Sequence, residues 1–135
     1  MIRKLDDKTW VSGQVAPHEV AELARSGVTM LVNNRPDGED ADQPLAGDIE
    51  AAAEQAGIGY RFVPIVRGIG PADVGSMQAA MRDAGDGAML AFCRSGTRSA
   101  LACALAHRSA GASAVDVANR LTQAGFDPSP IAHLL

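Results

Sequence analysis

Aromatic side chains are scarce in this chain, whose 135 residues include three Phe, one Trp and one Tyr. Because 47% of the residues are nevertheless hydrophobic, the core must be built mainly from Ala, Val, Leu, Ile and Met. This length fits one domain with a single core. We therefore expect a single domain over residues 1–135, in which the proline-broken segment 126–135 forms a C-terminal tail.

Long apolar runs are also missing, since no stretch approaches the roughly 20 apolar residues of a membrane span. The first eight residues carry charges with no apolar run behind them, so they do not predict a secretory signal. A net charge of −4 argues against a general binder of nucleic acid or anionic membranes. Two cysteines suit a reducing cytoplasm better than a disulfide scaffold, and the cytoplasm is the predicted location.

Signatures of metal and nucleotide binding are absent as well. The three histidines, His18, His107 and His133, do not have the spacing of metal ligands. No glycine-rich nucleotide fingerprint follows a strand-like segment. The sequence therefore predicts neither a metal nor a cofactor.

Short apolar segments alternate with longer amphipathic ones along the chain, which predicts an α/β fold. We expect a mostly parallel sheet of four or five strands with helices on both faces. Carboxyl ends of parallel strands share one edge of a sheet, so the loops that follow them should meet there. The predicted strands are 9–14 (at the edge of the sheet), 28–33, 60–66 and 88–92, and the predicted helices are 17–27, 46–55, 71–84, 99–109 and 113–125.

The most informative segment is Cys93-Arg94-Ser95-Gly96-Thr97-Arg98, between the predicted strand 88–92 and the helix after it. A cysteine here lies at the positive end of a helix dipole and beside two arginines, so we expect a lowered pKa and a nucleophilic thiolate. The amides of residues 94–97 and the guanidinium of Arg98 would bind a tetrahedral oxyanion above the sulfur. These features predict an enzyme that attacks phosphorus or sulfur. By contrast, Cys103 is predicted to be a small core residue.

Four motifs in order resemble one bacterial family, the beta-lactamase-hydrolase-like, phosphatase-like domain family, found alone or fused to persulfide dioxygenases of the metallo-beta-lactamase type. The resemblance covers about residues 2–125. It implies a fold like that of dual-specificity protein tyrosine phosphatases, with Cys93 in the phosphate-binding loop. In such phosphatases the residue matching Ser99 donates a hydrogen bond to the thiolate, and capping of the helix is the alternative role. The motifs are Val-Ser-Gly-Gln at 11–14, Asn-Asn-Arg-Pro-Asp-Gly-Glu at 33–39, Val-Pro-Ile-Val-Arg-Gly at 63–68 and Phe-Cys-Arg-Ser-Gly-Thr-Arg-Ser at 92–99.

The sequence departs from the usual phosphatase signature in two ways. Phe92 stands where that signature has His, and four residues instead of five separate Cys93 from Arg98. The shorter loop resembles that of rhodanese-type sulfurtransferases. The sequence therefore supports two functions almost equally. The first, narrowly preferred, is a phosphatase that forms a cysteinyl-phosphate on Cys93. The second is a sulfurtransferase that carries a Cys93 persulfide. A non-catalytic thiol or anion sensor is the third hypothesis.

A phosphatase also needs a general acid, for which Asp37 and Asp73 are the candidates. A turn role for Asp37 and a helix-dipole role for Asp73 are the structural alternatives. Arg35 and Arg67 either widen the positive rim of the site or pair with nearby acids. The expected partners are a small anionic substrate or a phosphoprotein, or else a sulfane-sulfur donor and a thiol acceptor, with no nucleic acid and no membrane.

Overall fold

The computed structural model describes all of residues 1–135 and contains five strands and five α-helices. The strands are β1 (Ile2–Asp6), β2 (Thr9–Ser12), β3 (Val28–Asn33), β4 (Gly59–Phe62) and β5 (Ala88–Phe92). The helices are α1 (Val20–Arg25), α2 (Ala46–Ala56), α3 (Pro71–Asp83), α4 (Thr97–Ser109) and α5 (Ala114–Gln123), with short 3₁₀ helices η1 (Pro17–Glu19) and η2 (Ser129–Leu134).

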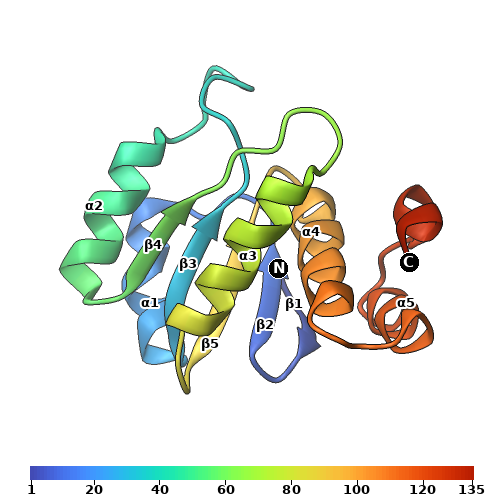
Figure 1. Cartoon of the computed structure of the whole chain (residues 1–135). Helices are drawn as coiled ribbons and strands as arrows, with labels where there is room; N and C mark the ends of the chain where they lie inside the picture. The colour runs from blue at the N-terminus through green and yellow to red at the C-terminus, as the bar shows by residue number, and fades with distance from the viewer.

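The strands form one sheet in the order β1-β2-β5-β3-β4, in which only the β1–β2 pair is antiparallel. Helices α1 and α2 cover one face of this sheet, and α3 and α4 cover the other (Figure 1). The α/β class, the mostly parallel sheet and the helices on both faces are confirmed.

The central strands β3 and β5 are buried on both faces, which is why they read as continuous apolar runs. Met89 and Ala91 of β5 point into the core beneath α3 and α4. Leu90 and Phe92, which alternate with them, point into the smaller core beneath α1 and α2. Helix α4 is rich in buried alanine, and these small side chains let it lie close to the sheet.

Two strand predictions need correction. β2 is not at the edge of the sheet, because β1 precedes it and pairs with it in an antiparallel hairpin. β1 is rich in charge and buries only Leu5, as edge strands commonly do, so it carries no apolar pattern. β4 ends at Phe62 rather than at residue 66. Pro64 has no N–H for the ladder, and beyond Phe62 the N–H groups of Val63 and Ile65 donate hydrogen bonds to Asn33 O and Asn34 O.

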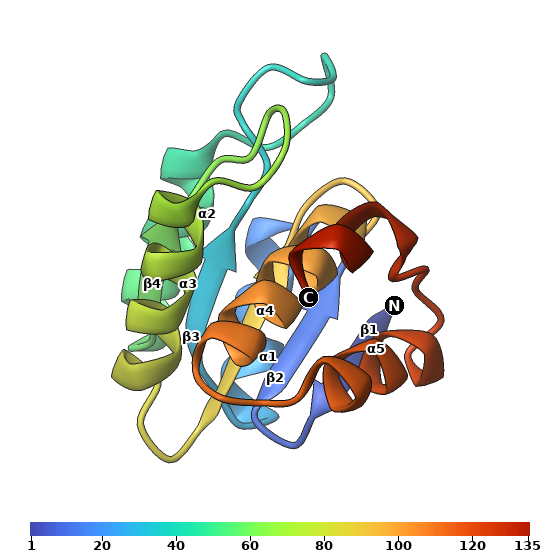
Figure 2. The same cartoon turned by 45° about the vertical axis from the view of Figure 1, so that its right-hand side comes forward.

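The C-terminal segment packs against the molecule through η2. Ile131 is buried in the core beneath α3 and α4, and η2 contacts α4. When the molecule is turned, η2 lies over α4, at the end of the sheet where the loops after β3 and β4 emerge (Figure 2). No helix of the chain is both long and apolar enough to cross a membrane.

Candidate active site

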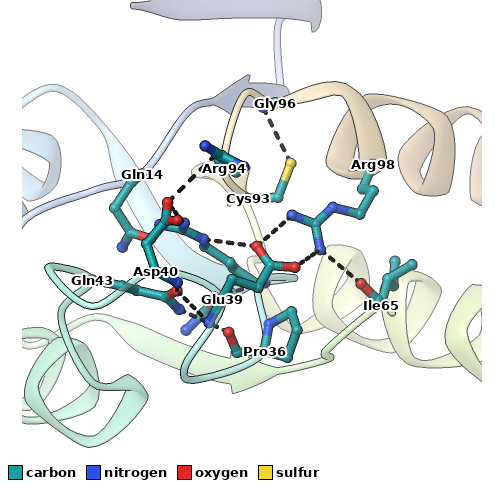
Figure 3. Close-up of polar contacts among 12 residues, drawn as sticks. Gln14, Pro36, Glu39, Asp40, Gln43, Ile65, Cys93, Arg94, Gly96 and Arg98 are labelled. Carbon is teal, nitrogen blue, oxygen red and sulfur yellow. Dashed lines mark hydrogen bonds and ion pairs between the residues drawn. The ribbon is translucent and has the colours of Figure 1, made fainter. Parts of the chain in front are cut away.

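The loops after β5, β3 and β4 meet at the carboxyl edge of the sheet, as the α/β pattern predicts (Figure 3). Arg98 links all three of them. It is the second residue of α4, just after the β5 loop, and it contacts Glu39 from the loop after β3 and Ile65 from the segment after β4. The site therefore draws on segments that lie far apart in sequence.

Cys93 directly follows β5, and only 1% of its surface is exposed. The Gly96 N–H donates a hydrogen bond to the Cys93 sulfur over 3.1 Å. The Cys93 N–H reaches Ser12 O of β2 over 3.4 Å. Since α4 begins at Thr97, the sulfur lies against the first unpaired amides of a helix, where a negative charge is stabilised.

Two glycines allow the Cys93 loop to close against β2. Gly96 has φ +96°, and a Cβ at this position would lie 3.3 Å from the Ser12 carbonyl group. A Cβ on Gly13 would lie 3.0 Å from Arg94 O. A side chain at either position would push the loop and the end of β2 apart.

Arg98 is held in place by three hydrogen bonds. Nη1 donates to Glu39 Oε2 at 2.6 Å and to Ile65 O at 2.8 Å, and Nη2 donates to Glu39 Oε1 at 2.9 Å. Of the five N–H groups of a guanidinium, those left are on Nε and Nη2, which share one edge of the plane. The hydrogen bond to Glu39 is the main cause of a raised pKa for Arg98. Burial lowers this pKa, and the charge of the nearby Cys93 raises it.

Glu39 bridges two arginines, a relationship that the sequence analysis missed. Its Oε1 also accepts a hydrogen bond from Arg35 Nε at 2.9 Å. Hydrogen bonding to Arg98, followed by that to Arg35, outweighs desolvation and lowers the pKa of Glu39 from 4.5 to about 2. The opposite charges of Arg35 and Glu39, four residues apart in a turn-rich loop, are the sequence signal that could have pointed to it.

Arg35 is buried, with 4% of its side chain exposed, so it does not widen the rim. It pairs with Glu39 and Asp40 and donates to Gln14 Oε1 over 3.0 Å, as its second predicted role requires. Arg67 is exposed and makes neither an ion pair nor a side-chain hydrogen bond.

The remaining loop residues face outward. Arg94 is 67% exposed and approaches Asp40 at 3.5 Å. Ser95 and Thr97 are exposed, and their hydroxyl groups are hydrogen-bonded to each other over 3.3 Å.

Both predicted acids accept hydrogen bonds from backbone amides. Asp37 accepts a hydrogen bond from the Ala46 N–H at 2.8 Å, at the start of α2. Asp73 accepts one from the Gly70 N–H at 2.9 Å, at the start of α3. Both carboxylates are therefore engaged at helix N-termini, where the helix dipole favours negative charge.

Ser99 takes a partner that the sequence analysis did not foresee. Its buried hydroxyl donates to Asn34 Oδ1 at 2.8 Å, and Asn34 Nδ2 donates to Val63 O at 2.9 Å. The first residue after β3 is thus joined to α4 on one side and to the segment after β4 on the other. Ser99 is the third residue of α4, whose N-cap is Gly96, so it does not cap the helix.

The two cysteines are both unpaired, and they differ in their surroundings. Cys103 is completely buried within α4, and burial raises the pKa of its thiol far above the usual range. It is a core residue, as predicted, whereas the Cys93 sulfur accepts a hydrogen bond from the Gly96 N–H at the start of α4.

The sequence has clear relatives. The family described as "Beta-lactamase hydrolase-like protein, phosphatase-like domain" matches residues 1–112. A beta-lactamase hydrolase-like protein of Xylella fastidiosa (strain Temecula1 / ATCC 700964) is 36% identical over 125 residues, which are 91% of this chain. The chain spans 29% of the length of that relative.

Solved structures share the fold. The crystal structure of a candidate phosphatase from Neisseria meningitidis is 29% identical, covers 98% of this chain with 94% of its own, and superposes with a TM-score of 0.82. P. aeruginosa TpbA, solved in complex with phosphotyrosine, is 18% identical, covers 98% of this chain with 80% of its own, and has a TM-score of 0.67. The family resemblance and the fold like that of dual-specificity phosphatases are confirmed.

Proposed function

The chain belongs to the phosphatase-like domain family of beta-lactamase hydrolase-like proteins, and on that premise we propose that it hydrolyses phosphomonoesters through a cysteinyl-phosphate on Cys93. One arrangement carries the proposal. The Gly96 N–H contacts the Cys93 sulfur at 3.1 Å, and the neighbouring Arg98 guanidinium keeps its Nε–Nη2 edge free of hydrogen bonds to protein oxygens. A nucleophile beside a cationic fork and helix N-terminal amides suits a phosphoryl group.

The reaction has two steps. The Cys93 thiolate attacks phosphorus, so that an S–P bond forms while the P–O bond to the leaving group breaks and its electron pair stays on that oxygen. Water then attacks phosphorus, the S–P bond breaks, and inorganic phosphate and the thiolate are released. Arg98 and the loop amides stabilise the charge on the equatorial oxygens in both steps.

The leaving oxygen takes its proton from solvent in this proposal, because Asp37 and Asp73 are both hydrogen-bonded at helix N-termini. Without an acid in place, the rate depends on how well the leaving group carries negative charge. Aryl phosphates, whose phenolate leaves readily, are therefore the expected best substrates. The phosphotyrosine bound to TpbA is consistent with this substrate class.

Glu39 acts as a positioning residue. Its carboxylate accepts hydrogen bonds from Nη1 and Nη2 at the end of the Arg98 guanidinium, which leaves the Nε–Nη2 edge for the substrate oxygens. Arg35, buried and bound to the same carboxylate, fixes Glu39 in turn. A guanidinium fixed in this way loses little conformational freedom when the phosphoryl group arrives.

The sulfurtransferase alternative is supported by the four-residue spacing between Cys93 and Arg98 alone. The matching family is described as phosphatase-like, and the similar solved structures include a candidate phosphatase and a protein with bound phosphotyrosine. In the sulfur reaction Cys93 would take a sulfane sulfur from thiosulfate, release sulfite, and pass the sulfur to cyanide or a thiol.

Paired assays test the proposal. Wild type, Cys93→Ser and Cys103→Ala are each given an aryl phosphate and, separately, thiosulfate with cyanide. We expect phosphate release from wild type and Cys103→Ala, and none from Cys93→Ser. Thiocyanate production without phosphate release would contradict the phosphatase proposal, and the absence of both products would favour the sensor hypothesis.

A further inference from the structure

An apolar groove of about 510 Å³ opens beside Arg98 on the side of η2. Its floor is formed by Leu101 of α4, one helical turn after Arg98, and its walls come from two other segments. Those walls are the segment after β4, with Ile65, Val66, Gly68 and Ile69, and the C-terminal segment, with Pro130, Ile131, His133 and Leu134.

Large apolar side chains stand exposed on both rims of the groove. Val66 is 73% exposed on one wall, and Leu134 is 52% exposed on the other. Single exposed apolar residues are ordinary on protein surfaces. Here Val66 and Leu134 line the same groove, and its inner residues Ile65 and Leu101 are also apolar. Together the four side chains form a continuous apolar surface that water solvates poorly.

The charges of the groove lie at its borders. No Asp or Glu lines it, and the polar side chains of its lining are those of Arg98 and His133. A second hollow of about 470 Å³ meets it at Ile69 and Leu134 and continues along α4 past Leu105. One face of α4 therefore begins with Arg98, continues with the apolar side chains of Leu101 and Leu105, and ends with the polar Arg108 and Ser109.

We infer that this groove binds the apolar body of the substrate, and that the substrate class is a phosphomonoester with an apolar body, of which the aryl phosphates above are one kind. This inference rests on the proposed function. Arg98 takes part in both the phosphoryl site and the groove, so an apolar body that extends from the bound phosphoryl group past Arg98 would lie beside Leu101 and between the two rims. A sugar or nucleoside body would bury hydroxyl groups against a lining in which His133 is the one polar side chain besides Arg98, and would bind poorly.

Alkylphosphonates test the inference without catalysis, because their C–P bond is not cleaved in the proposed reaction. The dissociation constants of methylphosphonate and hexylphosphonate are measured by calorimetry at concentrations below micelle formation. Each fully buried methylene contributes about fourfold in affinity. We expect hexylphosphonate to bind at least about tenfold more tightly than methylphosphonate, as the burial of two or more methylenes requires.

The groove is then altered by the double substitution Val66→Ser and Leu134→Gln, which keeps its charge. Both positions are exposed, and circular dichroism verifies the fold. The matched control is Val115→Gln on α5, which is 68% exposed and outside the groove. We expect the double variant to reduce the hexyl-to-methyl affinity ratio at least about threefold and the control to keep it.

Two results would overturn the inference: a wild-type ratio near one, or the same ratio in wild type and the double variant. Either result stands whether or not an aryl phosphate is hydrolysed, since no turnover enters the measurement. Failure of the groove inference is thereby distinguished from failure of the phosphatase proposal.

Discussion

The carboxylate of Glu39 spans the end of the Arg98 guanidinium, with oxygen–nitrogen distances of 2.6 and 2.9 Å. The two residues are 59 positions apart in sequence; Glu39 comes from the loop after β3, and Arg98 from the first turn of α4. This ion pair fixes the arginine relative to Cys93, so the loop after β3 takes part in building the proposed phosphoryl site.

Replacement of Glu39 by Gln should lower kcat/KM for an aryl phosphate by about tenfold to hundredfold, since a guanidinium that moves by an ångström no longer matches the reacting oxygens. Steady-state kinetics measures the loss. The matched control is Glu22→Gln, because Glu22 also pairs with an arginine, Arg25, but on the exposed surface of α1. This control should keep the wild-type rate, since exposed pairs contribute little.

The opposite result would change the account of Glu39. If Glu39→Gln bound phosphate more tightly and turned over faster than wild type, the carboxylate would be a competitor of the substrate for Arg98. The geometry predicts otherwise, because the Nε–Nη2 edge of Arg98 remains available while Glu39 is bound.

The same ion pair predicts how stability depends on pH. Because the pKa of Glu39 falls from 4.5 in the unfolded chain to about 2 in the folded protein, its contribution is complete above about pH 4.5 and is lost as the pH falls toward about 2. Urea unfolding of wild type and Glu39→Gln should show wild type more stable at about pH 6, with the difference shrinking below about pH 4.5. A difference that stays constant down to about pH 2.5 would contradict this contribution.

The buried pair between Ser99 and Asn34 makes a separate prediction. Ser99→Ala leaves Asn34 Oδ1 without its buried donor, and should lower the free energy of unfolding by about 1–3 kcal/mol. Ser26→Ala, at an exposed serine, should change it by less than about 0.5 kcal/mol. If Ser99→Ala instead kept full stability and lost activity, the hydroxyl would serve the thiolate, as the family resemblance implies.

The backbone of the Cys93 loop depends on Gly96. Gly96→Ala places a side chain at φ +96° and 3.3 Å from the Ser12 carbonyl group, so it should destabilise the protein by about 1–3 kcal/mol and lower activity. Gly47→Ala is the control, since its Cβ meets open space on α2, and it should raise stability by up to about 1 kcal/mol. Thermal unfolding measures the change in stability for both variants. Equal changes would show that the Cys93 loop does not depend on glycine at position 96.

Most of the fold could be predicted because its central elements carry strong local signals. β3 and β5 are buried on both faces and read as apolar runs, and their observed bounds equal the predicted ones. Gly57 ends α2 with φ +75°, as a C-terminal glycine predicts. β1 escaped prediction because it is stabilised by pairing with β2 rather than by an apolar pattern of its own.

The site was only partly predictable for a physical reason. The helix dipole and the loop amides at Cys93 are local features, so the sequence indicates them. The contacts of Glu39 with Arg98 and of Ser99 with Asn34 join residues 59 and 65 positions apart, and nothing in the local sequence specifies such pairs. Asp37 and Asp73 stood out by residue type, whereas their hydrogen bonds to Ala46 and Gly70 depend on the folded backbone.

The covalent intermediate is the most direct test of the central claim. Wild type and Cys93→Ser are mixed with an aryl phosphate, quenched in acid within a turnover, digested and examined by mass spectrometry. The proposed mechanism predicts one added phosphoryl group on the wild-type peptide that contains Cys93, and none on the same peptide of Cys93→Ser. Steady phosphate release with an unmodified Cys93 peptide at every quench time would contradict it.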